Sequence, residues 1–168
     1  MKSIFKLLFA AFLTVAPLTA NAQSNVAHIN VQQLISEMPE VIAAQNELAK
    51  LEKDYTTQID NAFKEFQTKA QSYSSDAANQ TDVTNQARQK ELESMQTNLQ
   101  EFRDSAAQEL QKKQMDLMNP LLEKARNAIN KVGEEQGFNY VIDSSPNGGI
   151  ILANGKDLLA DVKKELGF

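Results

Sequence analysis

The sequence has 168 residues, no cysteine, no tryptophan and a single histidine. Without cysteine there is no disulfide framework, no thiolate nucleophile and no cysteine-based zinc site. One histidine excludes histidine-rich metal sites and leaves few general bases near neutral pH. Only 6 glycines and 4 prolines are present, which argues against an all-β fold, because such folds need both residues in their turns. We therefore expect a protein that is not an enzyme and has no catalytic, metal or cofactor site.

The first 22 residues have the pattern of a secretory signal peptide. Two lysines precede an apolar run at 7–18, which is shorter than a membrane-spanning helix requires, and Ala20-Asn21-Ala22 is a cleavage pattern. We expect cleavage between Ala22 and Gln23. Loss of these 22 residues and their two lysines leaves 146 residues and changes the net charge from −5 to −7. The mature chain is predicted to be exported, to lack a transmembrane segment and not to bind nucleic acid.

Composition divides the mature chain into three zones and predicts an α+β fold that is mostly α. Residues 23–39 contain a strand and a turn that belong to a small body. Residues 40–118 have neither glycine nor proline and are rich in helix-forming residues. Residues 119–168 contain the base of a helix, a β-hairpin made by strands at 138–143 and 150–153, and an amphipathic C-terminal helix.

Two series of apolar residues, spaced by three and four, predict two long antiparallel helices in zone 40–118. Polar residues at 74–82 predict the tip that joins them, with Thr81 or Asp82 as an N-cap. The best alignment of the two series places Tyr55 opposite Leu99 and Lys50 opposite Asp104. Each helix then projects by roughly 54 Å. The predicted seam between the helices consists of Leu48, Leu51, Tyr55, Ile59, Phe66, Leu92, Met95, Leu99 and Phe102.

The base of the hairpin has a broader apolar face than its outer part, and Pro120 is predicted to kink the second helix there. Three short strands and one short helix cannot bury such a face alone. We therefore expect oligomerisation to complete the body. The predicted oligomer body consists of Val26, Ile29, Val31, Val141, Ile142, Ile150, Ile151, Leu152, Met118 and Leu122.

Isolated residues that could carry chemistry are better explained by structure. His28 lies in a predicted strand without a second histidine, and Ser144-Ser145 has no neighbouring base. Gly148-Gly149 is not followed by a helix with a lysine, so it is predicted to form a turn and not a phosphate loop.

Both ends of the mature chain carry a family resemblance. Residues 27–34 (AHINVQQL), 137–143 (GFNYVID) and 156–162 (KDLLADV) resemble the first strand and the C-terminal end of the Skp/OmpH family of periplasmic chaperones. The resemblance implies a homotrimer in the periplasm of a Gram-negative bacterium, with a barrel-like body and three hairpins around a cavity. It also implies that the cavity holds unfolded outer-membrane proteins before membrane insertion, without ATP.

The charge of the hairpin departs from the basic tentacles of the best-known family members. Residues 40–118 carry 9 Lys or Arg against 14 Asp or Glu. Electrostatic capture of acidic clients and a basic lipopolysaccharide site are therefore not predicted, and peripheral membrane contact stays open. The alternative function is a coiled-coil adaptor of the cell envelope that docks one folded partner.

Overall fold

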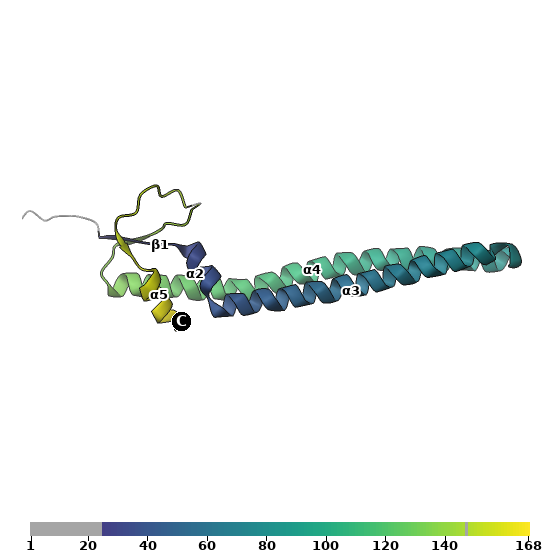
Figure 1. Cartoon of the computed structure of the whole chain (residues 1–168), viewed down its shortest axis with the longest axis horizontal. Coiled ribbons are helices and arrows are strands. Elements are labelled where there is room, and N and C mark those ends of the chain that lie inside the picture. Colours follow the sequence, from purple (N-terminus) through teal and green to yellow (C-terminus); the bar gives the residue numbers. More distant parts are fainter. Residues whose placement is uncertain (1–24, 147) are drawn as a thin grey trace, which may run out of the picture.

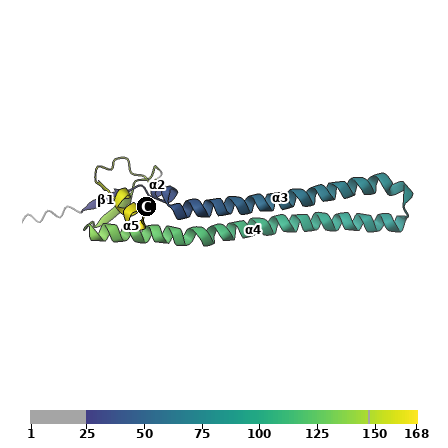
Figure 2. The same cartoon turned by 60° about the horizontal axis from the view of Figure 1, so that its bottom comes forward.

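The computed structural model describes residues 25–146 and 148–168, so the predicted signal peptide and the Ala22–Gln23 cleavage site lie outside the described residues. Helices α3 and α4 form a long antiparallel hairpin that projects from a small body (Figures 1 and 2). The predicted α+β, mostly α fold is thereby confirmed. In chain order the elements are β1 (Val26–Ile29), α2 (Val31–Glu37), α3 (Pro39–Asp76), the 3₁₀ turn η2 (Ala77–Asn79), α4 (Asp82–Glu135), β2 (Tyr140–Asp143), β3 (Lys156–Asp157) and α5 (Leu159–Leu166).

The sheet of the body is parallel, with the N-terminal strand β1 at its centre and β2 and β3 on either side. Val26 pairs with Tyr140, and Ala27 pairs with both Val141 and Lys156. A strand at Ile150–Ala153 and a β-hairpin with β2 were expected, and both expectations are wrong. The chain returns instead to the free edge of β1, where it forms the two-residue strand β3.

The loop between β2 and β3 is held at both ends by His28. The two ring nitrogens of His28 lie 3.2 Å from the hydroxyl of Ser144 and 3.1 Å from the carbonyl oxygen of Gly155. Gly155 leaves little room for a side chain, because a Cβ there would lie 3.0 Å from the carbonyl oxygen of Val26. The histidine therefore has the structural role expected of it.

One apolar cluster forms the core of the body. Ile29, Leu34, Met38 and Val41 are fully buried, and they pack with Leu158 and Val162 against α4. The buried residues that α4 contributes are small or β-branched: Ala125, Ala128, Val132 and Gly133. A Cβ at Gly133 would lie 2.8 Å from the side chain of Val141, so this glycine permits the close approach of β2 to the helix.

Side chains at the end of β2 and just after it help to cap helix α2, whose N-cap residue is Asn30. The Asp143 carboxylate accepts hydrogen bonds from the backbone N–H groups of Val31 and Ser145, at 3.3 and 2.9 Å, and from the Ser145 hydroxyl at 2.6 Å. The Ser145 hydroxyl oxygen accepts from the N–H of Gln32 at 3.0 Å. These bonds, led by the hydroxyl of Ser145, lower the pKa of Asp143. Ser145 thus serves the start of a helix and not a reaction.

The two long helices begin and end where local chemistry predicts. Pro39 occupies the first turn of α3, and the Thr81 hydroxyl accepts from the N–H of Thr84 at 3.2 Å as the N-cap of α4. Pro120 lies inside α4, and the helix continues through it to Glu135. Gly137, which follows, has a positive φ of 74°. The hairpin therefore consists of two uninterrupted helices, of which α4 also forms one wall of the body.

Candidate functional site

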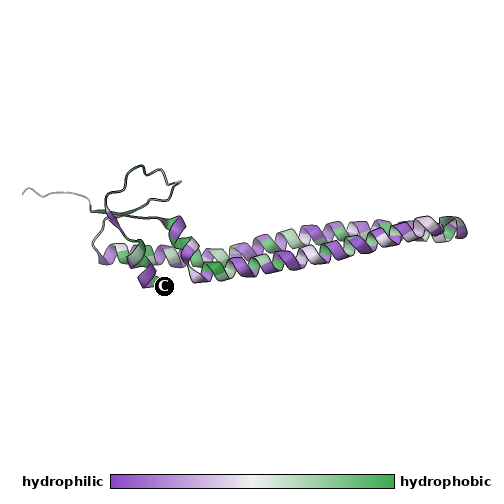
Figure 3. Cartoon of the chain, in the orientation of Figure 1, coloured by the Kyte–Doolittle hydropathy of each residue, from purple (hydrophilic) through white to green (hydrophobic). Residues whose placement is uncertain are grey.

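The hairpin seam is narrow. The structure places Leu99 among the buried residues and the eight other predicted seam residues at half-buried positions. Hydrophilic residues dominate the rest of the hairpin, whereas hydrophobic residues gather near its base (Figure 3). The helices therefore commit most of their apolar surface to each other and leave a largely polar exterior.

The alignment of the two helices differs from the predicted one by about one heptad. Tyr55 packs edge to face with Phe102, with ring centroids 6.0 Å apart, and it donates a hydrogen bond to Glu109. The expected pairing of Tyr55 with Leu99 and of Lys50 with Asp104 is therefore wrong. A stripe that repeats every three or four residues permits a slip by seven, and apolar spacing alone does not distinguish the two registers.

Near the tip, polar side chains replace the apolar seam. The apolar residues Val83 and Ala87 are exposed, and Arg88 and Glu91 occupy the seam instead. Arg88 donates to Asp76 at 3.0 Å and stacks 4.7 Å above the ring of Tyr73. At the tip, the two helices are thus held together by charged and aromatic side chains.

A second group of polar contacts lies one turn further from the tip. The Glu91 carboxylate accepts from Lys69 at 2.5 Å and from the Tyr73 hydroxyl at 2.6 Å, so it joins two residues of α3 to α4. Lys69 lowers the pKa of Glu91, with Tyr73 adding to the effect, and Arg88 is the largest cause of the lowered pKa of Asp76. The ionised carboxylates are therefore the forms that hold the outer hairpin together.

We predict that acid loosens the tip of the hairpin. A carboxyl whose pKa is lowered by folding stabilises the fold above its unfolded pKa, and this contribution is lost as the pH falls through the lowered value. The ordinary values are 4.5 for Glu91 and 3.8 for Asp76, so the loss is expected below about pH 4. Spin labels at the exposed positions Ser72 and Gln86 would measure it, because a chain without cysteine can be labelled at introduced cysteines alone.

The distance distribution between these labels should broaden on acidification in the wild-type chain. A Glu91→Gln variant should show the broad distribution already at pH 7. Glu93→Gln is the matched control, because the Glu93 carboxylate accepts a hydrogen bond from Gln89 on its own helix. A distribution that stays narrow in Glu91→Gln would contradict the role assigned to the polar contacts.

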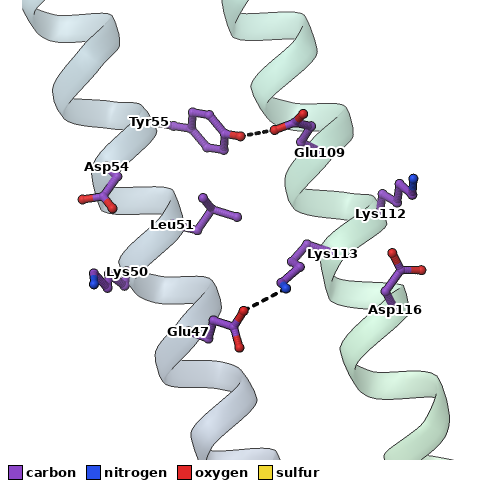
Figure 4. Close-up of a pocket in the computed structure, with 9 residues that line it drawn as sticks. All are labelled: Glu47, Lys50, Leu51, Asp54, Tyr55, Glu109, Lys112, Lys113 and Asp116. Carbon is purple, nitrogen blue, oxygen red and sulfur yellow. Dashed lines mark hydrogen bonds and ion pairs between the residues drawn. The ribbon is translucent and has the colours of Figure 1, made fainter.

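One face of the hairpin carries a cleft of about 450 Å³ between α3 and α4 (Figure 4). Its floor is Leu51 and Tyr55, and its other seven residues are all charged: Glu47, Lys50, Asp54, Glu109, Lys112, Lys113 and Asp116. Lys113 bonds Glu47 across the cleft at 2.8 Å, which raises the pKa of Lys113. We call this side the charged face. Because its charges of both signs are interleaved and partly paired, it is better suited to fixing the hairpin than to holding an ion.

Two further grooves lie beside Leu99, one on each side of the seam. One, of about 460 Å³, is bounded by Phe63 and Phe66 on α3 and by residues of α4 that include Gln96, Gln100 and Arg103. The other, of about 380 Å³, is bounded by Ala62, Met95 and Phe102. Phe63 remains 40% exposed although it stacks on Phe66 with centroids 6.5 Å apart. An aromatic residue outside the seam is therefore accessible on the hairpin.

The body has uncovered apolar residues beside open sheet edges. Of the predicted oligomer body, Ile29 is buried in the chain's own core, and Val26, Val31, Val141 and Met118 are half-buried. The others stay exposed: Ile142 at 39%, Ile150 at 37%, Ile151 at 101%, Leu152 at 75% and Leu122 at 45%. Within the described part of the chain nothing covers them, and large exposed apolar patches mark interaction surfaces.

Comparison with known proteins identifies the family. The family model described as "Outer membrane protein (OmpH-like)" matches residues 25–166, nearly the whole described chain. The chain belongs to the OmpH-like family. Two curated relatives are each named "Chaperone protein Skp". The protein from Yersinia enterocolitica is 28% identical over 96% of this chain and 98% of its own length. The protein from Pectobacterium atrosepticum is 21% identical over 90% of both chains.

The fold of the OmpH-like chain is also found in a solved structure. The crystal structure of an OmpH-like protein from Caulobacter crescentus CB15 matches 86% of this chain and 85% of its own, with a TM-score of 0.77 and 12% sequence identity. At this identity the likeness concerns the fold alone. The family resemblance inferred from the two ends of the sequence is confirmed by the match of the family model.

Sequence reasoning missed the polar contacts at the tip of the OmpH-like hairpin. The prediction of the hairpin rested on apolar residues at helical spacing: Lys69, Arg88 and Glu91 fall between or beside them, and Tyr73 is itself a member of the series. A signal was present, because Lys69, Tyr73 and Asp76 are spaced by four and three on α3, as Arg88 and Glu91 are spaced by three on α4. Residues of opposite charge on facing helices at such spacing predict cross-helix ion pairs.

Proposed function

We propose that this protein is an ATP-independent periplasmic holdase that cages unfolded outer-membrane proteins between export and membrane insertion. The proposal is supported by membership of the OmpH-like family and by the names of the Skp relatives. The observation that carries it is the shape of the chain: a long, polar-walled hairpin projects from a body whose apolar surface is incomplete. No reaction is assigned to any residue.

The active form in this proposal is a homotrimer. The three-stranded parallel sheet has free edges at β2 and β3, and apolar side chains stand exposed at Ile142 and in the loop at 150–152. Exposed strand edges favour pairing with another chain. Joining three bodies would cover these residues and would place three hairpins side by side, with a cavity between them.

Weak, numerous polar contacts are the means by which the cavity would hold a client. An unfolded barrel strand has free backbone groups and alternating side chains, and a wall without a deep apolar pocket can hold it in many registers. Within residues 25–146 and 148–168, no helix is both long and apolar enough to cross a membrane. Export to the periplasm is proposed from the signal-peptide pattern of the first 22 residues.

Sizing by light scattering, with and without a urea-unfolded β-barrel protein, tests the proposal. The mature chain alone should have the mass of a trimer, and dilution of the unfolded barrel protein into it should give a soluble complex of larger mass. Aggregation of several unrelated barrel proteins should be suppressed equally with and without ATP. Binding of one folded envelope protein, with no effect on unfolded chains, would favour the adaptor alternative.

A further inference from the structure

One lane along α4 is almost free of charge between residues 96 and 114. Gln96, Gln100, Arg103, Ala107, Gln111 and Gln114 follow one another at steps of four and three, so they lie on one side of the helix. All six are exposed. Arg103 is the one charged member of the lane. At the end nearest the body, the lane continues at the same spacing into Met118 and Leu122, which belong to the apolar base.

This lane lies on the side of the hairpin opposite the charged face. Gln96, Gln100 and Arg103 share a groove with Phe63 and Phe66, whereas Glu109, Lys112 and Asp116 share the charged cleft with Glu47 and Asp54. Two of the eight residues around the groove are charged, Glu101 and Arg103, and they are of opposite sign. The acidic excess of the hairpin is therefore not expressed around this groove. We call this side, the lane together with Phe63, the glutamine face.

Carboxamide side chains are suited to bonding an unfolded backbone. Each glutamine amide offers both donors and an acceptor, which match the free N–H and C=O groups of an extended chain. Glutamine carries no charge, so it does not repel a client of either sign. The adjoining Phe63, Met118 and Leu122 offer apolar contacts for the alternate side chains of such a strand.

We propose that the glutamine face is the client-contacting wall of the hairpin, and that its occupant is an extended segment of an unfolded polypeptide. This inference rests on the proposed holdase function and adds which side of each hairpin faces the cavity. The charge balance favours this occupant, because the lane carries one positive charge, at Arg103, whereas the charged face carries four carboxylates against three lysines. Continuity with the apolar base gives the segment a path from the hairpin toward the body.

Three isosteric charge substitutions test the inference. Gln96→Glu, Gln111→Glu and Gln114→Glu add three negative charges to the glutamine face, whereas Gln100 is kept because its amide bonds Asp104 at 3.0 Å. The matched control adds the same charge elsewhere, through Asn61→Asp, Asn98→Asp and Gln108→Glu, all at exposed positions. Asn98 lies in the groove on the other side of Leu99, and Gln108 lies on the side of α4 away from α3.

The measurement is the affinity for a urea-unfolded, acidic outer-membrane β-barrel protein after dilution, at low and high salt. The glutamine-face variant should lose about tenfold in affinity at low salt, because like charges at a contact are unfavourable, and should recover at high salt. The control variant should bind like the wild type. Circular dichroism and light scattering on both variants establish that helix content and assembly are unchanged.

Photo-cross-linking supplies an independent measurement that does not depend on charge. A photoreactive residue at Gln96 or Gln111 should cross-link to the client, whereas one at Asn61 or Gln108 should not. Equal loss in both charge variants, or cross-links mainly from Asn61 and Gln108, would overturn the inference while leaving the holdase function standing. Cross-links from Gln96 to a second copy of the chain would also overturn it, because the face would then be covered. A wild-type chain that binds no unfolded protein would overturn both.

Discussion

Replacing Ile142 by aspartate is expected to break the oligomer into single chains that are largely unfolded. Ile142 lies on the edge strand β2 and is 39% exposed in the single chain. In an isolated chain, a substitution at such a position changes the free energy of unfolding by about 0.5 kcal/mol or less. In an assembled body the same aspartate would be a buried, unpaired charge, which costs about 3–5 kcal/mol at each copy.

Light scattering combined with circular dichroism distinguishes an assembled, folded trimer from single chains that are largely unfolded. Wild-type protein and an Ile142→Val control should elute as trimers at micromolar concentration, and the aspartate variant should not. Because assembly and folding are linked, the comparison has to be made at one protein concentration. A wild-type chain that is a stable, folded monomer under these conditions would show that the exposed apolar residues of the body have another use.

Truncation of Leu34 to alanine is expected to lower the free energy of unfolding by about 2–5 kcal/mol. Leu34 is fully buried on the short helix α2, within the cluster that also contains Met38 and Val162. The small residues of α4 that surround this cluster leave little freedom to fill the space that the leucine would vacate. Urea denaturation followed by circular dichroism measures the change as a shift of the midpoint at constant slope.

Val83→Ala is the matched control for the core substitution. Val83 is 77% exposed in the first turn of α4, and its truncation should change the free energy of unfolding by no more than about 0.5 kcal/mol. Similar effects of the two substitutions would mean that α2 contributes little to the folded body. A large loss from Val83 would instead reveal contacts of the tip with another copy of the chain.

The helices and their ends were predictable from sequence because their determinants are local. Pro39 at a helix start, Thr81 as an N-cap and the apolar steps of three and four each act within a few residues. Strand β1 and most of β2 were also predictable from local sequence, because both are short runs of apolar or β-branched residues. Strand β3 was missed because Lys156–Asp157 is two residues long and exposed, so no pattern marks it.

The apolar run at 150–153 misled the prediction for a physical reason. Ile150, Ile151 and Leu152 have the composition of a strand, but in the single chain they have no neighbour to pair with, and they stand in the loop between β2 and β3. Pairing partners are supplied by tertiary structure, which a local pattern does not contain. The heptad slip in the hairpin has a similar origin, because the polar contacts of Glu91 and Lys113, and not the apolar steps, distinguish one register from another.

The position of β1 at the centre of the sheet affects the order in which the chain can fold. Val26 pairs with Tyr140 and His28 pairs with Asp157, so the first strand to be synthesised acquires both of its neighbours more than a hundred residues later. Contacts between such distant residues are slow to form unless another part of the structure first brings those residues close together. The hairpin does so, because α3 and α4 can associate locally from their tip and bring the two ends of the chain together. The rate of folding should therefore depend on the polar tip, far from the body whose sheet forms last.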